Sequence, residues 1–198
     1  MAIKLASIFF TMILVDNYVL AKFLGICPFL GVSKKLDSAV GMSLAVTFVM
    51  VMATAATWPL YMGILAPNGL EYLQTIVFIL VIAILVQLLE NFLKKFIPAL
   101  YKSLGVYLPL ITTNCTILGV TILTLDNGYS FPESIVCAAG AGIGFLVAMV
   151  LFSGVRRKVE QAIVPECFKG LPITLVAAAM TSLSFMGFGG IVEAIFGV

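Results

Sequence analysis

Long apolar stretches alternate with short polar links along almost the whole chain. Each stretch holds roughly 20 residues or more, the length that a helix needs to cross a hydrocarbon core about 30 Å thick. The links are rich in Lys, Asp, Asn, Gly and Pro, which favour turns. We therefore predict six membrane-spanning helices, at residues 3–32, 38–61, 71–92, 104–125, 134–155 and 171–196.

The composition supports a membrane protein rather than a water-soluble one. Of the 198 residues, 62% are hydrophobic and only 10% are charged, whereas about 25% is typical of soluble domains. The formal net charge is only +2, and no stretch has a dense Lys/Arg pattern, so we expect no nucleic-acid partner. We predict one all-α membrane domain over residues 1–198, with the bilayer as its environment.

The basic residues give the predicted orientation. Six spans place nine Lys and Arg residues on one side of the membrane and only Lys4 on the other, while Lys22 lies within the first span. Because positive loops stay in the cytoplasm, we expect the basic side to be cytoplasmic and both termini to lie outside. The nine residues are Lys34, Lys35, Lys94, Lys95, Lys102, Arg156, Arg157, Lys158 and Lys169.

Several kinds of site and signal are excluded by what the chain lacks. It has no histidine, which removes a histidine-ligated haem and a Ser-His-Asp triad. Its four cysteines form no CxxC pair, the spacing common in zinc sites. The first apolar stretch is too long for a cleaved signal peptide, so we expect it to be retained as a span.

A short motif occurs twice and suggests an internal repeat. Residues 27–32 and 115–120 both read C-x-x-L-G-V, 88 residues apart, in the first and fourth predicted spans. Three spans per half is an odd number, so the second half (96–198) would be inverted relative to the first (1–95). Inverted repeats usually place the working site near the midplane, at discontinuous helices.

Helix-breaking residues accompany both motifs. Gly25 and Pro28 flank Cys27, and Pro109 precedes Cys115. We predict that the first and fourth helices are broken, with a cysteine at each break. The alternative is a pair of ordinary Pro/Gly kinks at which the cysteines pack as small hydrophobic side chains.

Two cysteines brought together at such breaks would suit a metal, a disulfide or redox chemistry. An iron–sulfur cluster normally takes four cysteines. Cys137 lies among alanines and glycines, where packing is the simpler role, and Cys167 lies in a basic loop. A second, similar subunit that supplies two more cysteines is therefore the better source of the missing ligands.

Other residues are candidates for supporting roles. Thr112, Thr113 and Asn114 lie beside Cys115 and could donate hydrogen bonds to the sulfurs, and Gly25 beside Cys27 is a further candidate for a supporting role at the site. Asp16 and Glu90 are ionisable residues inside predicted spans, where such groups are costly and usually functional; we consider both as ion-path candidates. The alternative for Glu90 is a helix-end carboxylate paired with Lys94 at i,i+4 spacing.

Two longer strings resemble a known family. Residues 23–35 (FLGICPFLGVSKK) and 108–115 (LPLITTNC) are similar to the A-type membrane subunit of the Rnf electron-transport complex. The E-type subunit of the Na⁺-translocating NADH:quinone reductase is a close relative, but Pro28 and Thr113 favour the Rnf type. The resemblance covers essentially the whole chain.

The resemblance implies a fold, a cofactor and partners. The family has six helices in an inverted repeat, and its A-type member pairs with a homologous E-type subunit of opposite topology. The pair is expected to share one [2Fe–2S] cluster, which places Cys27 and Cys115 among its ligands. The relative in the quinone reductase has a glutamate that matches Glu90 and is thought to serve ion uptake.

The implied function is electron relay in the cytoplasmic (inner) membrane of a bacterium or archaeon. The complex couples ferredoxin oxidation and NAD⁺ reduction to Na⁺ or H⁺ translocation, together with iron–sulfur and flavin subunits. This chain would be an electron-transfer subunit without catalytic residues of its own. The alternatives are the quinone-reductase subunit and a small secondary transporter without a redox centre.

Overall fold

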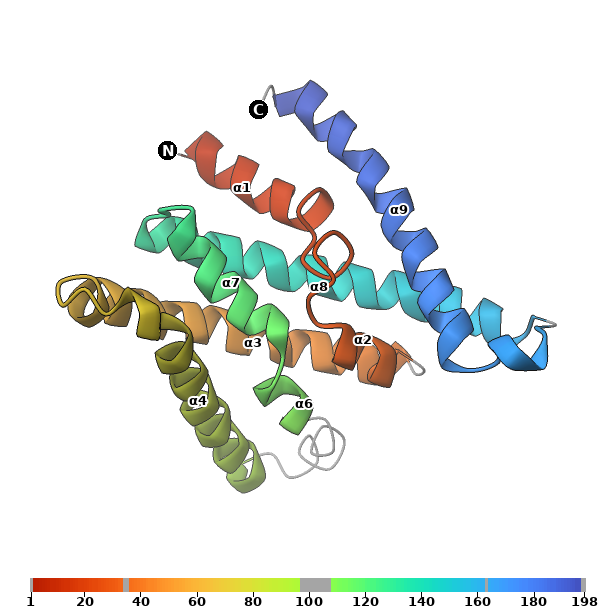
Figure 1. Ribbon diagram of the computed structural model, residues 1–198, viewed down its shortest axis with the longest axis horizontal. Helices are drawn as coiled ribbons and strands as arrows, with labels where there is room; N and C mark the ends of the chain where they lie inside the picture. Colours follow the sequence, from red (N-terminus) through yellow and green to blue (C-terminus); the bar gives the residue numbers. More distant parts are fainter. Residues whose placement is uncertain (1, 34–35, 97–107, 163, 197–198) are drawn as a thin grey trace.

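All regular structure in the part of the chain described by the computed structural model is helical (Figure 1). The described residues are 2–33, 36–96, 108–162 and 164–196. The elements are α1 (Ala2–Leu14), α2 (Ile26–Val32), α3 (Leu36–Leu60), η1 (Tyr61–Leu65), η2 (Glu71–Leu73), α4 (Gln74–Phe96), α6 (Leu108–Thr112), α7 (Cys115–Asp126), α8 (Phe131–Glu160), η3 (Glu166–Phe168) and α9 (Leu171–Phe196). The predicted all-α class is confirmed.

Three stretches are long and apolar enough to cross a bilayer: Ser38–Leu65, Gln74–Phe92 and Phe131–Glu160. Three shorter apolar helices, Lys4–Leu14, Leu110–Asp126 and Leu171–Gly187, fall in the other three predicted segments. The helical, membrane-type character is therefore established, whereas six complete crossings are not. Lys34, Lys35, Lys102 and the first residues of the fourth predicted segment lie outside the described residues.

The long helices α3 and α8 pack along each other at the centre of the molecule (Figure 1). The inner face of α8 is rich in small buried residues, including Ala138, Ala141 and Gly142. A methyl group at Gly142 would lie 2.4 Å from the Cγ2 atom of Thr47 on α3. Small residues thus let the two backbones approach closely.

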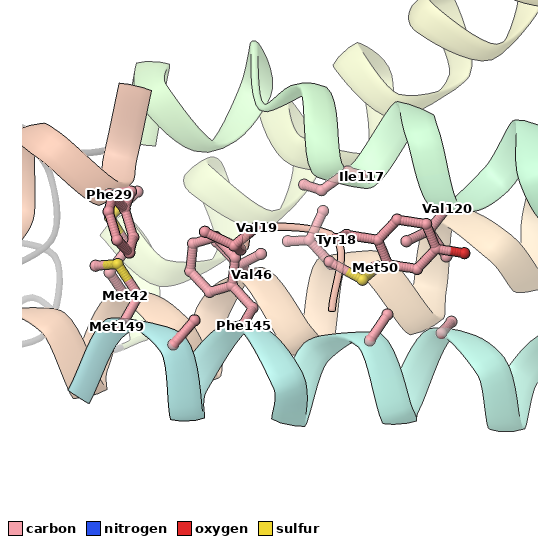
Figure 2. Close-up of a cluster of buried hydrophobic side chains, with 14 of the residues drawn as sticks. Tyr18, Val19, Phe29, Met42, Val46, Met50, Ile117, Val120, Phe145 and Met149 are labelled. Atoms are coloured by element: carbon pink, nitrogen blue, oxygen red, sulfur yellow. The ribbon is translucent and has the colours of Figure 1, made fainter. Parts of the chain in front are cut away.

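The hydrophobic core contains side chains from α3, α7, α8 and the segment between α1 and α2 (Figure 2), together with residues from α1, α2, α4, α6 and α9. Tyr18 and Val19 come from that non-helical segment, and each is only 2% exposed. They meet Val46 of α3 and Phe145 of α8 in one cluster. The segment that separates α1 from α2 is therefore part of the hydrophobic core.

The connections between the helices lie at two opposite ends of the α3–α8 pair. The α3–α4 and α7–α8 turns lie at one end of the helix pair, and the α8–α9 link lies at the other (Figure 1). At the first end, Trp58 Nε1 donates to the Tyr129 carbonyl at 3.1 Å. At that end Lys4 also forms a 2.7 Å ion pair with Glu133, at the start of α8.

Candidate functional site

The first predicted segment is interrupted between α1 and α2, just before Cys27. Helix α1 ends at Leu14 and α2 begins at Ile26, so Cys27 is the second residue of the new helix. Phe23 (φ 55°) and Gly25 (φ 80°) have left-handed backbone conformations that continuous helix does not contain. The cysteine side chain is exposed, which leaves its sulfur accessible to a partner.

Asn17 holds this interruption against α8. Its Nδ2 donates to the Gly144 carbonyl at 2.8 Å, and its Oδ1 accepts from the backbone N–H groups of Val19 and Leu20. The Leu20 carbonyl accepts from the Ser182 hydroxyl of α9. Non-helical backbone inside an apolar protein must satisfy its polar groups internally, and Asn17 and Ser182 do so here.

The fourth predicted segment is interrupted by two residues, Thr113 and Asn114. Helix α6 ends at Thr112 and α7 begins at Cys115. The Asn114 side chain caps α7 by accepting from the Thr116 N–H at 3.0 Å, the usual role of asparagine at a helix start. Cys115 is exposed, and it contributes to the wall of a mostly apolar pocket of about 420 Å³ between α4 and the α6–α7 break.

One hydrogen bond joins the two interruptions. The Gly25 N–H donates to Cys115 Sγ at 2.9 Å, across 90 residues of sequence. A side chain at Gly25 would not fit, because its Cβ would lie 2.2 Å from Thr116 Oγ1. The tight fit keeps the backbone N–H of one break against the sulfur of the other, and backbone donors to sulfur are how proteins tune iron–sulfur centres.

Two further polar atoms at this junction have no hydrogen-bond partner within the described part of the chain. They are Asn114 Nδ2 and Thr116 Oγ1, and their residues are only 4% and 0% exposed. Buried polar groups are nearly always satisfied. A group that accepts hydrogen bonds, held between the breaks and a second chain, would fit the amide donor of Asn114.

The remaining candidate residues predicted from the sequence are Thr113, Asp16 and Glu90. Thr113 is exposed on the pocket wall. Asp16 lies in the α1–α2 interruption, and Glu90 lies on α4, where Gln87 Nε2 approaches it at 3.4 Å. Neither carboxylate hydrogen-bonds to the cysteine pair in the described residues.

The other two cysteines do not join the pair. Cys137 is fully buried in α8, and Cys167 is exposed in η3. The described residues contain no cluster of three or more His, Cys, Asp or Glu side chains that could hold a metal ion. A four-cysteine centre at this site would therefore draw its other ligands from another chain.

The sequence patterns did not assign a role to Asn17, Ser182 or Thr116. An asparagine inside an apolar stretch was a usable signal for Asn17, because such a polar group needs internal partners. Ser182 and Thr116 carried no comparable signal, since serine and threonine inside apolar helices commonly bond to their own backbone.

Comparisons with a family profile and with individual proteins point to the same family. The profile of the family described as "Rnf-Nqr subunit, membrane protein" matches residues 5–192. The A-type subunit of the ion-translocating oxidoreductase complex of Syntrophotalea carbinolica is 54% identical over 180 residues, which is 91% of this chain and 93% of the relative.

Two further relatives agree with this. The A-type subunit of the Na⁺-translocating ferredoxin:NAD⁺ oxidoreductase complex of Acetobacterium woodii is 53% identical over 186 residues, covering 94% of this chain and 97% of the relative. The A-type subunit of the ion-translocating oxidoreductase complex of Aliivibrio salmonicida is 51% identical over 181 residues, covering 91% and 94%.

Proposed function

The chain belongs to the Rnf-Nqr family of membrane subunits, and on this basis we propose that it is an electron-relay subunit of an ion-translocating ferredoxin:NAD⁺ oxidoreductase. The names of its relatives supply the reaction. The observation that carries the relay role is the 2.9 Å hydrogen bond from the Gly25 N–H to Cys115 Sγ. It brings the two helix breaks together, with one exposed cysteine at each.

The proposed cofactor is a [2Fe–2S] cluster shared with a second chain. Cys27 and Cys115 would hold one half of it, and a homologous E-type subunit of opposite topology would supply two more cysteines. Such a cluster carries one electron at a time without bond making in the protein. The chain has no catalytic residue in this proposal; it binds, orients and shields the centre.

The residues around the cysteines fit such a group. The Gly25 N–H donates to the Cys115 sulfur, and the Asn114 amide is a buried donor without a partner in the described residues. Donors of this kind offset the negative charge of thiolate and sulfide. The apolar walls of the adjoining pocket, including Ile79, Ile82 and Leu118, would keep water away.

We propose an inverted repeat as the frame of this site. Each half has a broken helix pair (α1–α2 and α6–α7), then a long helix (α3 and α8), then a further helix (α4 and α9). Six crossings then place both termini outside and the basic links in the cytoplasm. Iron–sulfur and flavin subunits of the complex would exchange electrons with the centre from the two sides of the inner membrane.

Ion movement is the second half of the proposed activity. Asp16 lies in the α1–α2 break and Glu90 lies on α4, so both are available as carboxylates within membrane-type segments. Ionisable groups at such depth usually mark ion or proton paths. We propose them as ion-path residues for Na⁺ or H⁺.

Cysteine substitution in the intact complex tests the cluster. Cys27→Ala and Cys115→Ala should each remove one [2Fe–2S] component from the electron paramagnetic resonance (EPR) spectrum of the complex and lower its iron content, while the signals of the other iron–sulfur subunits remain. Cys137→Ala and Cys167→Ala are the matched controls and should leave both unchanged. Loss of this component in the Cys137 variant alone would contradict the assignment. If neither Cys27→Ala nor Cys115→Ala changed the spectrum or the ion movement, a secondary transporter without a redox centre would be favoured.

A further inference from the structure

The half-helix α2 (Ile26–Val32) carries Cys27 but is too short to hold its own position. Seven residues form fewer than two helical turns, and isolated helices of that length are unstable. Its last carbonyl groups have no partner inside the helix. The position of the Cys27 sulfur therefore depends on what the rest of the chain does to α2.

Helix α8 contacts α2 through two residues on one of its faces. Phe152 stacks on Phe29, with ring centroids 4.0 Å apart and an angle of 24° between the rings. Four residues further on, Arg156 donates from Nη1 to the Leu30 carbonyl and to Ser33 Oγ, the latter at 2.8 Å. Residues four apart lie on the same side of a helix, so these contacts form one docking surface for α2.

The Phe29 contact sets the direction in which Cys27 points. Residues two apart in a helix project about 200° from each other. Phe29 is 3% exposed against α8, so Cys27 projects to the opposite, exposed side. Rotation of α2 away from Phe152 would turn the cysteine away from its present direction.

The Arg156 contact fixes the position of α2 along the axis of α8. Its side chain is only 9% exposed, and its guanidinium meets the carbonyl end of α2, where a positive charge is favoured. A hydrogen bond from a buried charged donor is stronger than a neutral one. Glu160, 3.4 Å from Nε, holds the guanidinium from the solvent side.

From these contacts we infer that Arg156 is a positioning residue for Cys27: its guanidinium caps α2 and fixes where α2 holds this cysteine. The sequence pattern had explained Arg156 only as part of the positive cytoplasmic loop. The consequence for an iron centre rests on the proposed function, but the consequence for α2 does not.

The test compares Arg156→Gln with Arg157→Gln in the whole complex. Arg157 is the exposed neighbour and controls for the loss of one basic residue. Arg156→Gln should speed amide hydrogen exchange in residues 26–33 by about tenfold or more, with α7 unchanged. It should also broaden, shift or abolish the EPR signal of the iron centre, while Arg157→Gln should match the unmodified complex in both measurements.

A conservative variant keeps the test decisive if Arg156→Gln does not assemble. Arg156→Lys retains the charge but not the forked donor geometry, and should give faster exchange in α2 than the unmodified complex. Unchanged exchange in α2, or an equal change in Arg157→Gln, would overturn the inference. If Cys27→Ala and Cys115→Ala left the iron content and the EPR spectrum of the complex unchanged, the proposed cluster would be refuted, while the exchange measurement would still decide the role of Arg156.

Discussion

At position 25 the backbone conformation and the lack of space for a side chain both require glycine. Its φ of 80° lies in the left-handed region, which costs other residues about 1–2 kcal/mol. Its Cα also faces Thr116, so a Cβ atom has no room. Both requirements serve one contact, the N–H that reaches Cys115 Sγ.

We expect Gly25→Ala to lower the free energy of unfolding by about 1–2 kcal/mol for the backbone conformation and by a further ~1–3 kcal/mol for the steric clash. Gly69→Ala is the matched control, because Gly69 has a φ of 66° and nothing within 4 Å of the added methyl group. It should show the first loss only. Thermal unfolding of both variants in the same detergent measures the difference, and equal losses would contradict the steric argument.

Among the elements, the α1–α2 interruption is a fixed structure and not a loose connection. Tyr18 and Val19 are buried in the core, and Asn17 and Ser182 satisfy its backbone from neighbouring positions and from α9. Helix α2, with Cys27 as its second residue, follows this segment directly. The fixed backbone of the segment therefore restrains the start of α2.

Removal of the Asn17 amide should loosen this segment. Asn17→Ala loses the bond to the Gly144 carbonyl and leaves two N–H groups without their acceptor, for which we expect a loss of about 2–3 kcal/mol in unfolding free energy. Asn127→Ala, at an exposed position after α7, should change it by less than about 0.5 kcal/mol. Denaturant titration of both variants would show an equal effect if Asn17 had no special role.

Across the molecule as a whole, the two ends of the α3–α8 pair differ in charge. The last turn of α8, with Arg157 and Lys158, and the α8–α9 link, with Lys169, lie at the end opposite the α3–α4 and α7–α8 turns (Figure 1). Positive residues retained in the cytoplasm would orient the chain in the way that the proposed relay between two faces of the membrane needs.

Vesicles of opposite orientation test this arrangement. A membrane-impermeant maleimide should label Cys167, which is exposed in η3, only from the cytoplasmic side. An Asn68→Cys variant, at an exposed position in the α3–α4 turn, should be labelled there only from the outer side. Cys137, which is buried, serves as the unlabelled control in site-resolved mass spectrometry. Labelling of both exposed positions from one side would contradict the predicted orientation.

The helical membrane class and the positions of both interruptions could be predicted from the order of residues alone. Length and apolarity predict membrane-type helices, and Gly25 is a local signal of the first interruption because of its backbone freedom. Pro28 and Pro109 lie in the first turns of α2 and α6, so they indicate where those helices begin. Such properties depend on neighbours along the chain, so a pattern can reveal them.

The packing of the helices determines which distant residues come into contact. The Gly25–Cys115 bond spans 90 residues, the Asn17–Gly144 bond spans 127, and Arg156 reaches Leu30 across 126. The first contact follows from how α7 packs beside the α1–α2 segment, and the other two follow from how α8 packs beside that segment and α2. A linear pattern of apolar and polar positions contains no record of that packing. It named both cysteines and Gly25, but it did not pair Gly25 with Cys115 or bring the Arg156 guanidinium to α2.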